Sequence, residues 1–203
     1  MRKGKEETSL ILFANMSSMS VHLEEWGRLA QEFEKAGADL IEANFCCPNI
    51  GLTTFQLGKK VAARLSTGAS IGQVPELCRE VAKILKSAVK IPVVCKMSPT
   101  ALDLSEIAKA CEEGGADGLS LFGGPSLALP PLDIYNGGKP LYPLLNGASF
   151  GFYSGPWIKY PTYKSVAQTV MSVKIPVCAS GGIVNWRDNV EMIMWGATLT
   201  SAC

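Results

Sequence analysis

The chain has 203 residues, of which 47% are hydrophobic and 18% are charged, and its formal net charge is +1 at pH 7. This length and balance are typical of a single globular domain with a sizeable core. A net charge close to zero gives no electrostatic reason to expect nucleic acid or an anionic membrane as a partner. No apolar run approaches the roughly 18 residues that span a bilayer.

The seven cysteines form neither a C-x-x-C pair nor a dense framework, and the chain has a single histidine. We therefore expect no metal site and no iron–sulfur cluster held by this chain. The charged N-terminal segment is followed by only a short apolar run, which is unlike a secretory signal. We expect a cytoplasmic protein in which most cysteines (Cys46, Cys78, Cys95, Cys111 and Cys178) are small buried hydrophobes.

The first third of the chain predicts two strands and one helix. Residues 10–14 form a strand-like apolar run, and residues 23–36 have apolar side chains at helical spacing. Gly37 is suited to ending that helix, and residues 39–43 predict the second strand. Residues 44–72, which are rich in Gly, Ser and Thr, are expected to form a loop.

The middle of the chain continues the same alternation. Pro75 occupies the first turn of a predicted helix over residues 76–89, where its missing N–H costs nothing. Residues 91–96 predict a third strand, residues 104–113 a helix, and residues 117–122 a fourth strand.

The last third begins with a long irregular stretch over residues 123–155, dense in Gly, Pro and Asn. Loops of this length within a domain are usually functional or disordered. A helix over residues 156–172, a strand over residues 175–179, a helix over residues 185–195 and a strand over residues 197–200 complete the pattern.

Two short sequences recur where a helix gives way to a strand. A-G-A-D at residues 36–39 resembles G-G-A-D at residues 114–117, and K-I-P-V occurs at residues 90–93 and 174–177. This repetition favours a parallel sheet with helices outside it. Because no G-x-G-x-x-G opens a helix, a (β/α)8 barrel is favoured over an open doubly wound sheet.

A closed barrel has eight strands and typically about 250 residues. We expect the chain to form one domain that supplies about six of the eight strands. Two strand–helix units before residue 10 and one helix after Cys203 would then be absent, and the chain would be a fragment or part of an assembly.

Polar and glycine residues follow the predicted strands, at the end where barrel enzymes carry their reactive groups. They are Asn15, Ser17 and Ser18 after the first strand, Asn44, Cys46, Cys47 and Asn49 after the second, Lys96 at the third, Gly123 and Gly124 after the fourth, Ser180, Gly181 and Gly182 after the fifth, and Ser201 and Ala202 after the sixth.

The run E-A-N-F-C-C-P-N at residues 42–49 is similar to the E-L-N-L-S-C-P-N signature of class 1 dihydroorotate dehydrogenases and of the flavin domain of dihydropyrimidine dehydrogenase. The resemblance continues at residues 94–99, 114–118, 150–155 and 180–183. It implies a (β/α)8 barrel with FMN that oxidises or reduces the C5–C6 bond of a pyrimidine ring.

The resemblance also implies roles for individual residues. Cys47 would be the acid/base that exchanges the proton at ring C5, since a thiol pKa can be lowered toward working pH. Asn44 and Asn49 would hydrogen-bond the ring. Lys96 would stabilise negative charge on reduced flavin. The remaining cofactor-binding residues would surround the FMN phosphate and are Gly155, Ser180, Gly181, Gly182, Ser201 and Ala202.

The chain departs from the family where relatives have an Asn-Ser or Asn-Thr pair, because it has Gly123 and Gly124 there. The substrate is therefore expected to be pyrimidine-like, without a prediction of which pyrimidine. Without an iron–sulfur motif, electrons would pass through NAD(P)H, a soluble acceptor or an electron-transfer subunit. A homo-oligomer is also expected, and the segment from residue 52 to residue 72 is a candidate lid.

Simpler interpretations stay open. Cys47 is otherwise an inert thiol, Asn44 and Asn49 cap turns, and Gly181 with Gly182 forms a tight turn. Two other functions remain: a flavin-free, phosphate-binding barrel lyase or isomerase, and a non-catalytic partial-barrel subunit.

Overall fold

The computed structural model describes residue 7 and residues 9–18, 22–47, 68–122, 127–141, 151–152 and 154–202. Within these residues, one parallel sheet has the strand order β1-β2-β3-β4-β9-β10. Its strands are β1 (Phe13–Met16), β2 (Leu40–Asn44), β3 (Val93–Met97), β4 (Gly118–Phe122), β9 (Val177–Ser180) and β10 (Leu199–Ser201).

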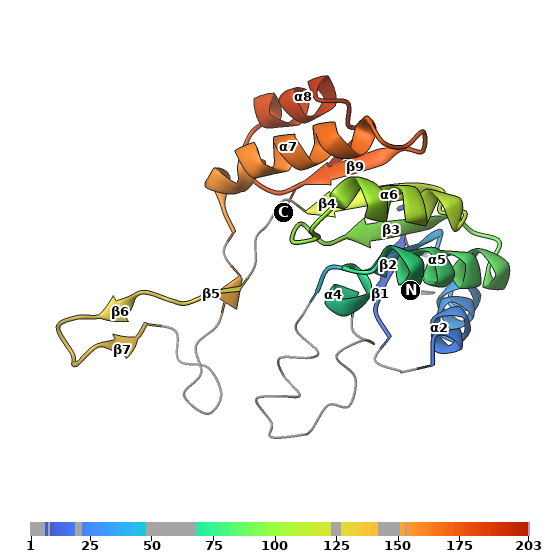
Figure 1. Ribbon diagram of the computed structural model, residues 1–203, viewed down its shortest axis with the longest axis horizontal. Helices are drawn as coiled ribbons and strands as arrows, with labels where there is room; N and C mark the ends of the chain where they lie inside the picture. Colours follow the sequence, from blue (N-terminus) through green and yellow to red (C-terminus); the bar gives the residue numbers. More distant parts are fainter. Residues whose placement is uncertain are drawn as a thin grey trace.

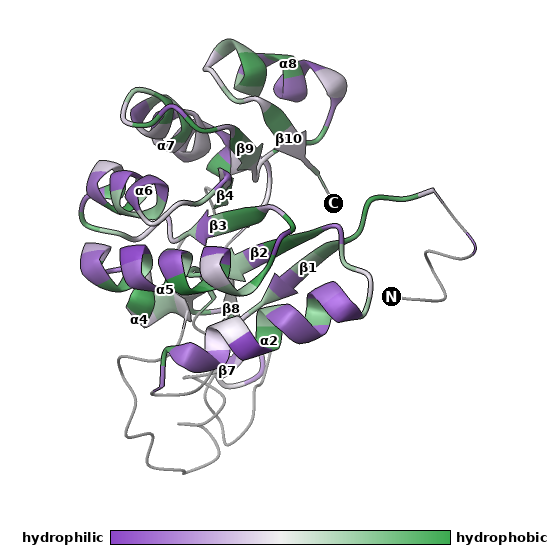
Figure 2. Cartoon of the chain, turned by 90° about the vertical axis from the view of Figure 1, so that its right-hand side faces the viewer, coloured by the Kyte–Doolittle hydropathy of each residue, from purple (hydrophilic) through white to green (hydrophobic). Residues whose placement is uncertain are grey.

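The helices lie on the outer face of this curved sheet, each beside the strands it connects (Figure 1). They are α2 (Glu24–Lys35), α4 (Gly68–Ile71), α5 (Pro75–Ala88), α6 (Leu104–Glu113), the 3-10 helix η2 (Pro156–Ile158), α7 (Lys159–Val170) and α8 (Trp186–Met194). Figure 2 shows hydrophilic residues along α2, α5 and α6.

The strand order decides between the two parallel architectures. Neighbouring strands follow one another in chain order without a reversal, and the helices pack on one face. A doubly wound sheet reverses its order and carries helices on both faces, whereas a barrel does neither. The predicted barrel architecture, with six strands in this part of the chain, is confirmed.

Alternation along the strands separates a helix-facing side from an inner side. In β3, the side chains of Val93, Cys95 and Met97 are fully buried against the helices. Val94 and Lys96, which point the other way, are only half-buried. The inner side of the sheet therefore carries the groups that are available for chemistry.

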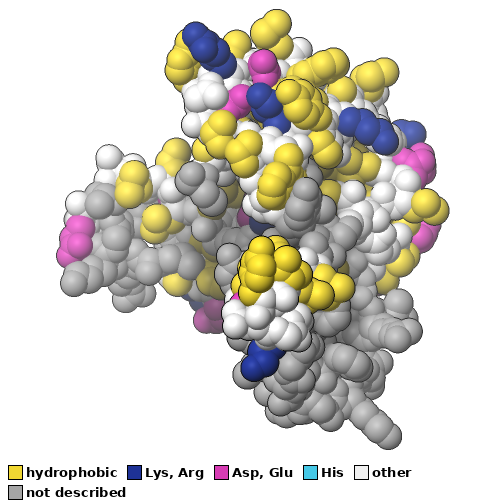
Figure 3. All heavy atoms as spheres, turned by 90° about the vertical axis from the view of Figure 1, so that its left-hand side faces the viewer, with side chains coloured by type: hydrophobic (Ala, Val, Ile, Leu, Met, Phe, Trp, Pro, Cys, Tyr) yellow, Lys and Arg dark blue, Asp and Glu magenta, His cyan; other side chains and the backbone are white. Residues whose placement is uncertain are grey.

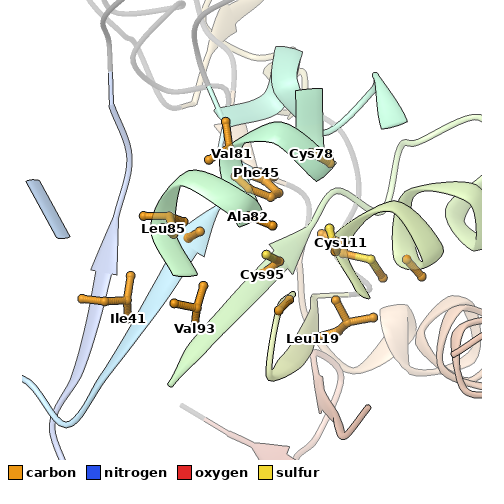
Figure 4. Close-up of a cluster of buried hydrophobic side chains, with 14 of the residues drawn as sticks. Ile41, Phe45, Cys78, Val81, Ala82, Leu85, Val93, Cys95, Cys111 and Leu119 are labelled. Atoms are coloured by element: carbon orange, nitrogen blue, oxygen red, sulfur yellow. The ribbon is translucent and has the colours of Figure 1, made fainter. Parts of the chain in front are cut away.

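The hydrophobic core lies between the sheet and the helices (Figure 4). Val81 and Leu85 of α5 pack there with Ile41 and Val93 of the sheet, and all four side chains are fully buried. Cys78, Cys95 and Cys111 are buried in the same layer, as predicted for cysteines that serve as small hydrophobes. Cys178 is different, because it is half-buried on the inner side of β9.

Some predicted elements differ in extent. The first strand begins at Phe13 instead of residue 10, and α4 lies inside a segment that was expected to be a loop. The stretch predicted to be irregular contains the antiparallel pairs β5 (Leu127–Ala128) with β8 (Gly151–Phe152) and β6 (Leu132–Asp133) with β7 (Lys139–Pro140).

The β6–β7 hairpin projects from the body of the molecule (Figure 1). Figure 3 shows hydrophobic side chains on this face of the molecule, and Ile134 and Tyr135 of the hairpin are 75% and 90% exposed. No described helix is both long enough and apolar enough to cross a membrane.

Truncating the core should be costly, whereas truncating the surface should not. We expect Leu85→Ala to lower the free energy of unfolding by about 2–5 kcal/mol, because it leaves a cavity under α5. Leu102→Ala is the matched control, since Leu102 is fully exposed, and should change it by less than about 0.5 kcal/mol. Urea denaturation measures both, and equal effects would contradict the packing described for α5.

Candidate active site at the carboxyl ends of the strands

The segment that carries Cys47 is anchored by contacts with α2, β3 and α4. Phe45 is fully buried and packs edge-on against Trp26 of α2, with ring centroids 5.5 Å apart. Its backbone N–H donates to the carbonyl of Lys96, which extends the β2–β3 pairing by one residue. A Cβ at Gly68 would lie 2.0 Å from the Asn44 carbonyl oxygen, so α4 packs directly on the end of β2.

The two adjacent cysteines have different environments. Cys46 is buried, and burial is the main reason that its pKa is raised to about 11, with the neighbouring Cys47 adding to the effect. Cys47 is only half-buried at the carboxyl end of the barrel sheet. Of the two thiols, Cys47 is therefore the more accessible, and accessibility is what a reactive cysteine requires.

The side chain of Asn44 is 6% exposed and closes the turn that leads to Cys47. Its Oδ1 accepts the backbone N–H of Cys46 at 3.1 Å and of Cys47 at 3.0 Å. Its Nδ2 donates to Oδ1 of Asn15 at 3.2 Å. The turn-capping interpretation of Asn44 is therefore correct for its oxygen, and its second amide N–H has no hydrogen-bond partner among the described residues.

Lys96 lies beside Asn44 on the inner side of the sheet, because the two residues are paired in the β2–β3 register. Its Nζ lies 5.9 Å from the centroid of the Phe122 ring. Among the described residues it forms no ion pair with a carboxylate. A half-buried ammonium group without a paired anion is suited to an anionic or electron-rich ligand.

The predicted phosphate-binding residues Ser180, Gly181, Gly182, Ser201 and Ala202 lie at the same carboxyl edge of the sheet, at the ends of β9 and β10. Ser180 and Ser201 are paired in the β9–β10 register. Gly181 and Gly182 follow with φ of 103° and 78°, which L side chains rarely adopt. Ala202 follows β10, and its side chain is exposed.

The glycine turn rests on the start of α7. A Cβ at Gly182 would lie 2.4 Å from the backbone nitrogen of Lys159, so no side chain fits there. Gly155, with φ of 130°, lies just before η2 and thus at the same end of the barrel sheet.

A buried ion pair fixes the loop after β9. Asp188 of α8 accepts a hydrogen bond from Lys159 at 2.8 Å, and its other oxygen accepts the backbone N–H groups of Val184 and Asn185 at 2.9 and 3.0 Å. The Lys159 hydrogen bond and then the backbone N–H groups hold the pKa of Asp188 below its usual value. The glycine turn is therefore attached to α7 and α8.

The sequence placed Asn15 at a strand end without giving it a role, and it did not single out Glu42, Ser120 or Asp188. Ser120 donates to Oε1 of Glu42 at 2.6 Å, and Asn15 donates to Oε2 of the same carboxylate. The available signal was alternation, because Glu42 lies two residues before Asn44 and thus on the same side of β2. Of the predicted features, Asn49, Gly123, Gly124 and the candidate lid up to residue 67 lie outside the described residues.

The described residues fit FMN. Three strand spacings, about 14 Å at 4.8 Å each, separate Asn44 on β2 from Ser180 on β9. A cationic side chain lies on the Asn44 side, and a turn with two successive glycines of positive φ follows Ser180 on the other. This arrangement suits an elongated ligand with an electron-rich ring at one end and a phosphate at the other.

Comparison with known proteins agrees with this geometry. The family model described as dihydroorotate dehydrogenase matches residues 1–202. The chain belongs to the dihydroorotate dehydrogenase family.

Two curated members of this family illustrate the similarity. The catalytic subunit of dihydroorotate dehydrogenase B (NAD(+)) from Methanothermobacter thermautotrophicus is 36% identical over 180 residues, which are 85% of this chain and 52% of that protein. The NAD-dependent dihydropyrimidine dehydrogenase subunit PreA from Escherichia coli is 30% identical over 202 residues, which are 97% of this chain and 45% of that protein. The chain thus spans about half the length of these relatives.

A solved structure supports the fold alone. The FabK (M276A) mutant from Thermotoga maritima superposes with a TM-score of 0.51 over 98% of this chain and 45% of that chain, at 14% identity.

The glycine turn should not tolerate a side chain. We expect Gly182→Ala to lower the free energy of unfolding by about 2 kcal/mol more than Gly137→Ala does. Both glycines have positive φ, but a Cβ at Gly137 would have no atom within 4 Å. The pair thus separates backbone strain from the collision with Lys159, and equal losses in urea denaturation would contradict the close packing.

The ion pair between Asp188 and Lys159 should make the free energy of unfolding depend on pH. Asp188→Asn should destabilise the fold, because an amide is uncharged and pairs less well with Lys159. Since the folded pKa of Asp188 is lowered, its contribution is present above the unfolded pKa of about 3.9 and is lost as the pH falls through the folded value. In urea unfolding, the gap between wild type and variant should be constant from about pH 5 to 8 and should narrow below about pH 4. Glu80→Gln, on the exposed face of α5, is the control without such a gap.

Proposed function

We propose that the protein is an FMN-dependent oxidoreductase that acts on the C5–C6 bond of a dihydropyrimidine- or dihydroorotate-like ring. One observation carries the proposal: the half-buried thiol of Cys47 follows β2 at the carboxyl edge of the sheet, and Lys96 is paired there with Asn44. In this proposal the Cys47 thiol would exchange the proton and Lys96 would supply a positive charge at the same edge of the sheet.

The reaction divides the two hydrogens of the C5–C6 bond. In the oxidative direction, the Cys47 thiolate takes the proton from C5 and becomes a thiol, while the hydrogen at C6 leaves as hydride and the C5=C6 double bond forms. FMN supplies the two-electron acceptor for that hydride. In the reductive direction, the Cys47 thiol returns the proton to C5.

The other residues would bind and orient the two ligands. The free N–H of Asn44 and the side chain of Asn49 would hydrogen-bond the pyrimidine ring, and Lys96 would face the electron-rich side of the flavin. The backbone N–H groups around Gly181 and Gly182, with Gly155, Ser180, Ser201 and Ala202, would surround the phosphate.

Partners are proposed from the relatives. The names of both curated relatives include NAD and describe subunits. We propose that electrons pass between the FMN of this chain and NAD(H) through another subunit, and that the chain forms a homo-oligomer in the cytoplasm. The described cysteines are free thiols, as expected in a reducing compartment.

The test compares two neighbouring thiols in the full-length protein. Cys47→Ala should lower kcat by roughly 10²- to 10⁴-fold, the usual contribution of a positioned acid or base, and should leave the absorption band of oxidised flavin in place. Cys46→Ala is the matched control and should stay within a few-fold of wild type, because the buried Cys46 thiol is protonated near neutral pH.

Two results would overturn the proposal. Turnover of dihydroorotate and dihydrouracil that is unaffected by Cys47→Ala would remove the proton-transfer role. A colourless protein that is fully active without added flavin would favour a flavin-free lyase or isomerase.

A further inference from the structure

We propose that Glu42 is a positioning residue for Cys47 and acts on it through Asn15 and Asn44. The inference deepens the proposed function, because it assigns a cause to the placement of the acid/base. It rests on a chain of hydrogen bonds that joins three strands and ends at the backbone of the cysteine segment.

The backbone N–H groups of Cys46 and Cys47 determine which atom donates and which accepts in every hydrogen bond of this series. The backbone N–H groups of Cys46 and Cys47 can only donate, so the atom of Asn44 that they contact must be its oxygen. The amide nitrogen of Asn44 therefore faces Asn15 and requires an acceptor there, which is Oδ1 of Asn15. The nitrogen of Asn15 then faces Glu42, whose Oε2 accepts it.

Glu42 is the fixed end of this series of hydrogen bonds, which runs through Asn15 and Asn44 to the backbone of Cys47 and is called the relay below. It lies in the middle of β2, and its second carboxylate oxygen accepts the hydroxyl of Ser120 at 2.6 Å. Ser120 belongs to β4, so the carboxylate joins strands that β3 separates. A side chain held from two sides has little freedom to rotate, and it passes that restraint to the exposed side chain of Asn15.

Among the described residues, Glu42 makes its side-chain hydrogen bonds to Asn15 and Ser120 and none directly to the cysteine segment. It precedes Asn44 by two residues, or about 6.6 Å along a strand. The hydrogen bonds that connect it to Cys47 pass through Asn15 and Asn44. Displacement of a reacting group by about 1 Å can cost about a hundredfold in rate, so this indirect effect is large enough to measure.

The experiment separates the acceptor from its charge. Glu42→Gln keeps an oxygen to accept from Asn15, and Ser120 can accept from the new amide nitrogen. Glu42→Met has a similar size and no acceptor. Asn15→Leu removes the same hydrogen bonds at an exposed residue, and it replaces Glu42→Met in the test if Glu42→Met fails to fold. Glu80→Met on α5 is the control for the loss of a carboxylate elsewhere.

The direct readout is hydrogen exchange of the Cys46 and Cys47 amides in the full-length protein, measured with or without turnover. We expect exchange to be about tenfold faster in Glu42→Met and in Asn15→Leu, and close to wild type in Glu42→Gln and Glu80→Met. In turnover, Glu42→Met should lower kcat by about 10- to 100-fold with a nearly unchanged KM. The double variant Asn15→Leu/Glu42→Met should be no slower than Asn15→Leu, because both changes break the same relay.

The outcomes separate this proposal from the proposed function. Unchanged exchange at both amides in Glu42→Met and Asn15→Leu overturns the relay, whatever the enzyme catalyses. Failure of Glu42→Gln to restore wild-type exchange overturns the acceptor role, and additive losses of kcat in the double variant overturn the indirect action. If exchange responds as expected while Cys47→Ala retains full turnover, the relay stands and the proposed function fails.

Discussion

Parallel pairing in strict chain order is the constraint on which the rest of the structure depends. Because β1, β2, β3, β4, β9 and β10 all run in the same direction, their carboxyl ends lie along one edge of the sheet. The register then decides which side chains are neighbours: Asn44 lies beside Lys96, and Ser180 lies beside Ser201. Residues more than 100 positions apart in the sequence thus share one edge without any direct bond between them.

Within that frame, burial distinguishes chemically equivalent groups. Cys46 and Cys47 are adjacent in sequence, but the first is buried with a pKa of about 11 and the second is half-buried at the strand end. The anchoring of Phe45 against Trp26 produces this difference, because it fixes which side of the segment faces the core. The aromatic contact on the outer face of the sheet thus anchors the segment in which Cys46 is buried and Cys47 is half-buried.

Most of the architecture could be predicted from sequence, because the spacing of apolar residues distinguishes helices from buried strands. The similar sequences at residues 36–39 and 114–117 also indicate a repeated βα unit. The short hairpins and α4 could not, since Gly- and Pro-rich segments carry no such period. The site was predicted for residues within recognisable motifs. Glu42 and Ser120 were missed because their partnership depends on strand register, which places residues 78 positions apart within hydrogen-bonding distance.

The saturated carbonyl of Asn44 has a consequence for ligand recognition. With its oxygen occupied by two backbone N–H groups, this amide can offer a bound ring only a donor. A ring that turns a carbonyl oxygen toward it gains a hydrogen bond, whereas an isostere that presents an N–H there leaves two donors facing each other. An unsatisfied buried donor costs about 1–3 kcal/mol, or roughly 5- to 150-fold in affinity. If a ring binds beside Asn44 as proposed, the residue that caps the cysteine turn would therefore also favour a ring carbonyl over a ring N–H at that position.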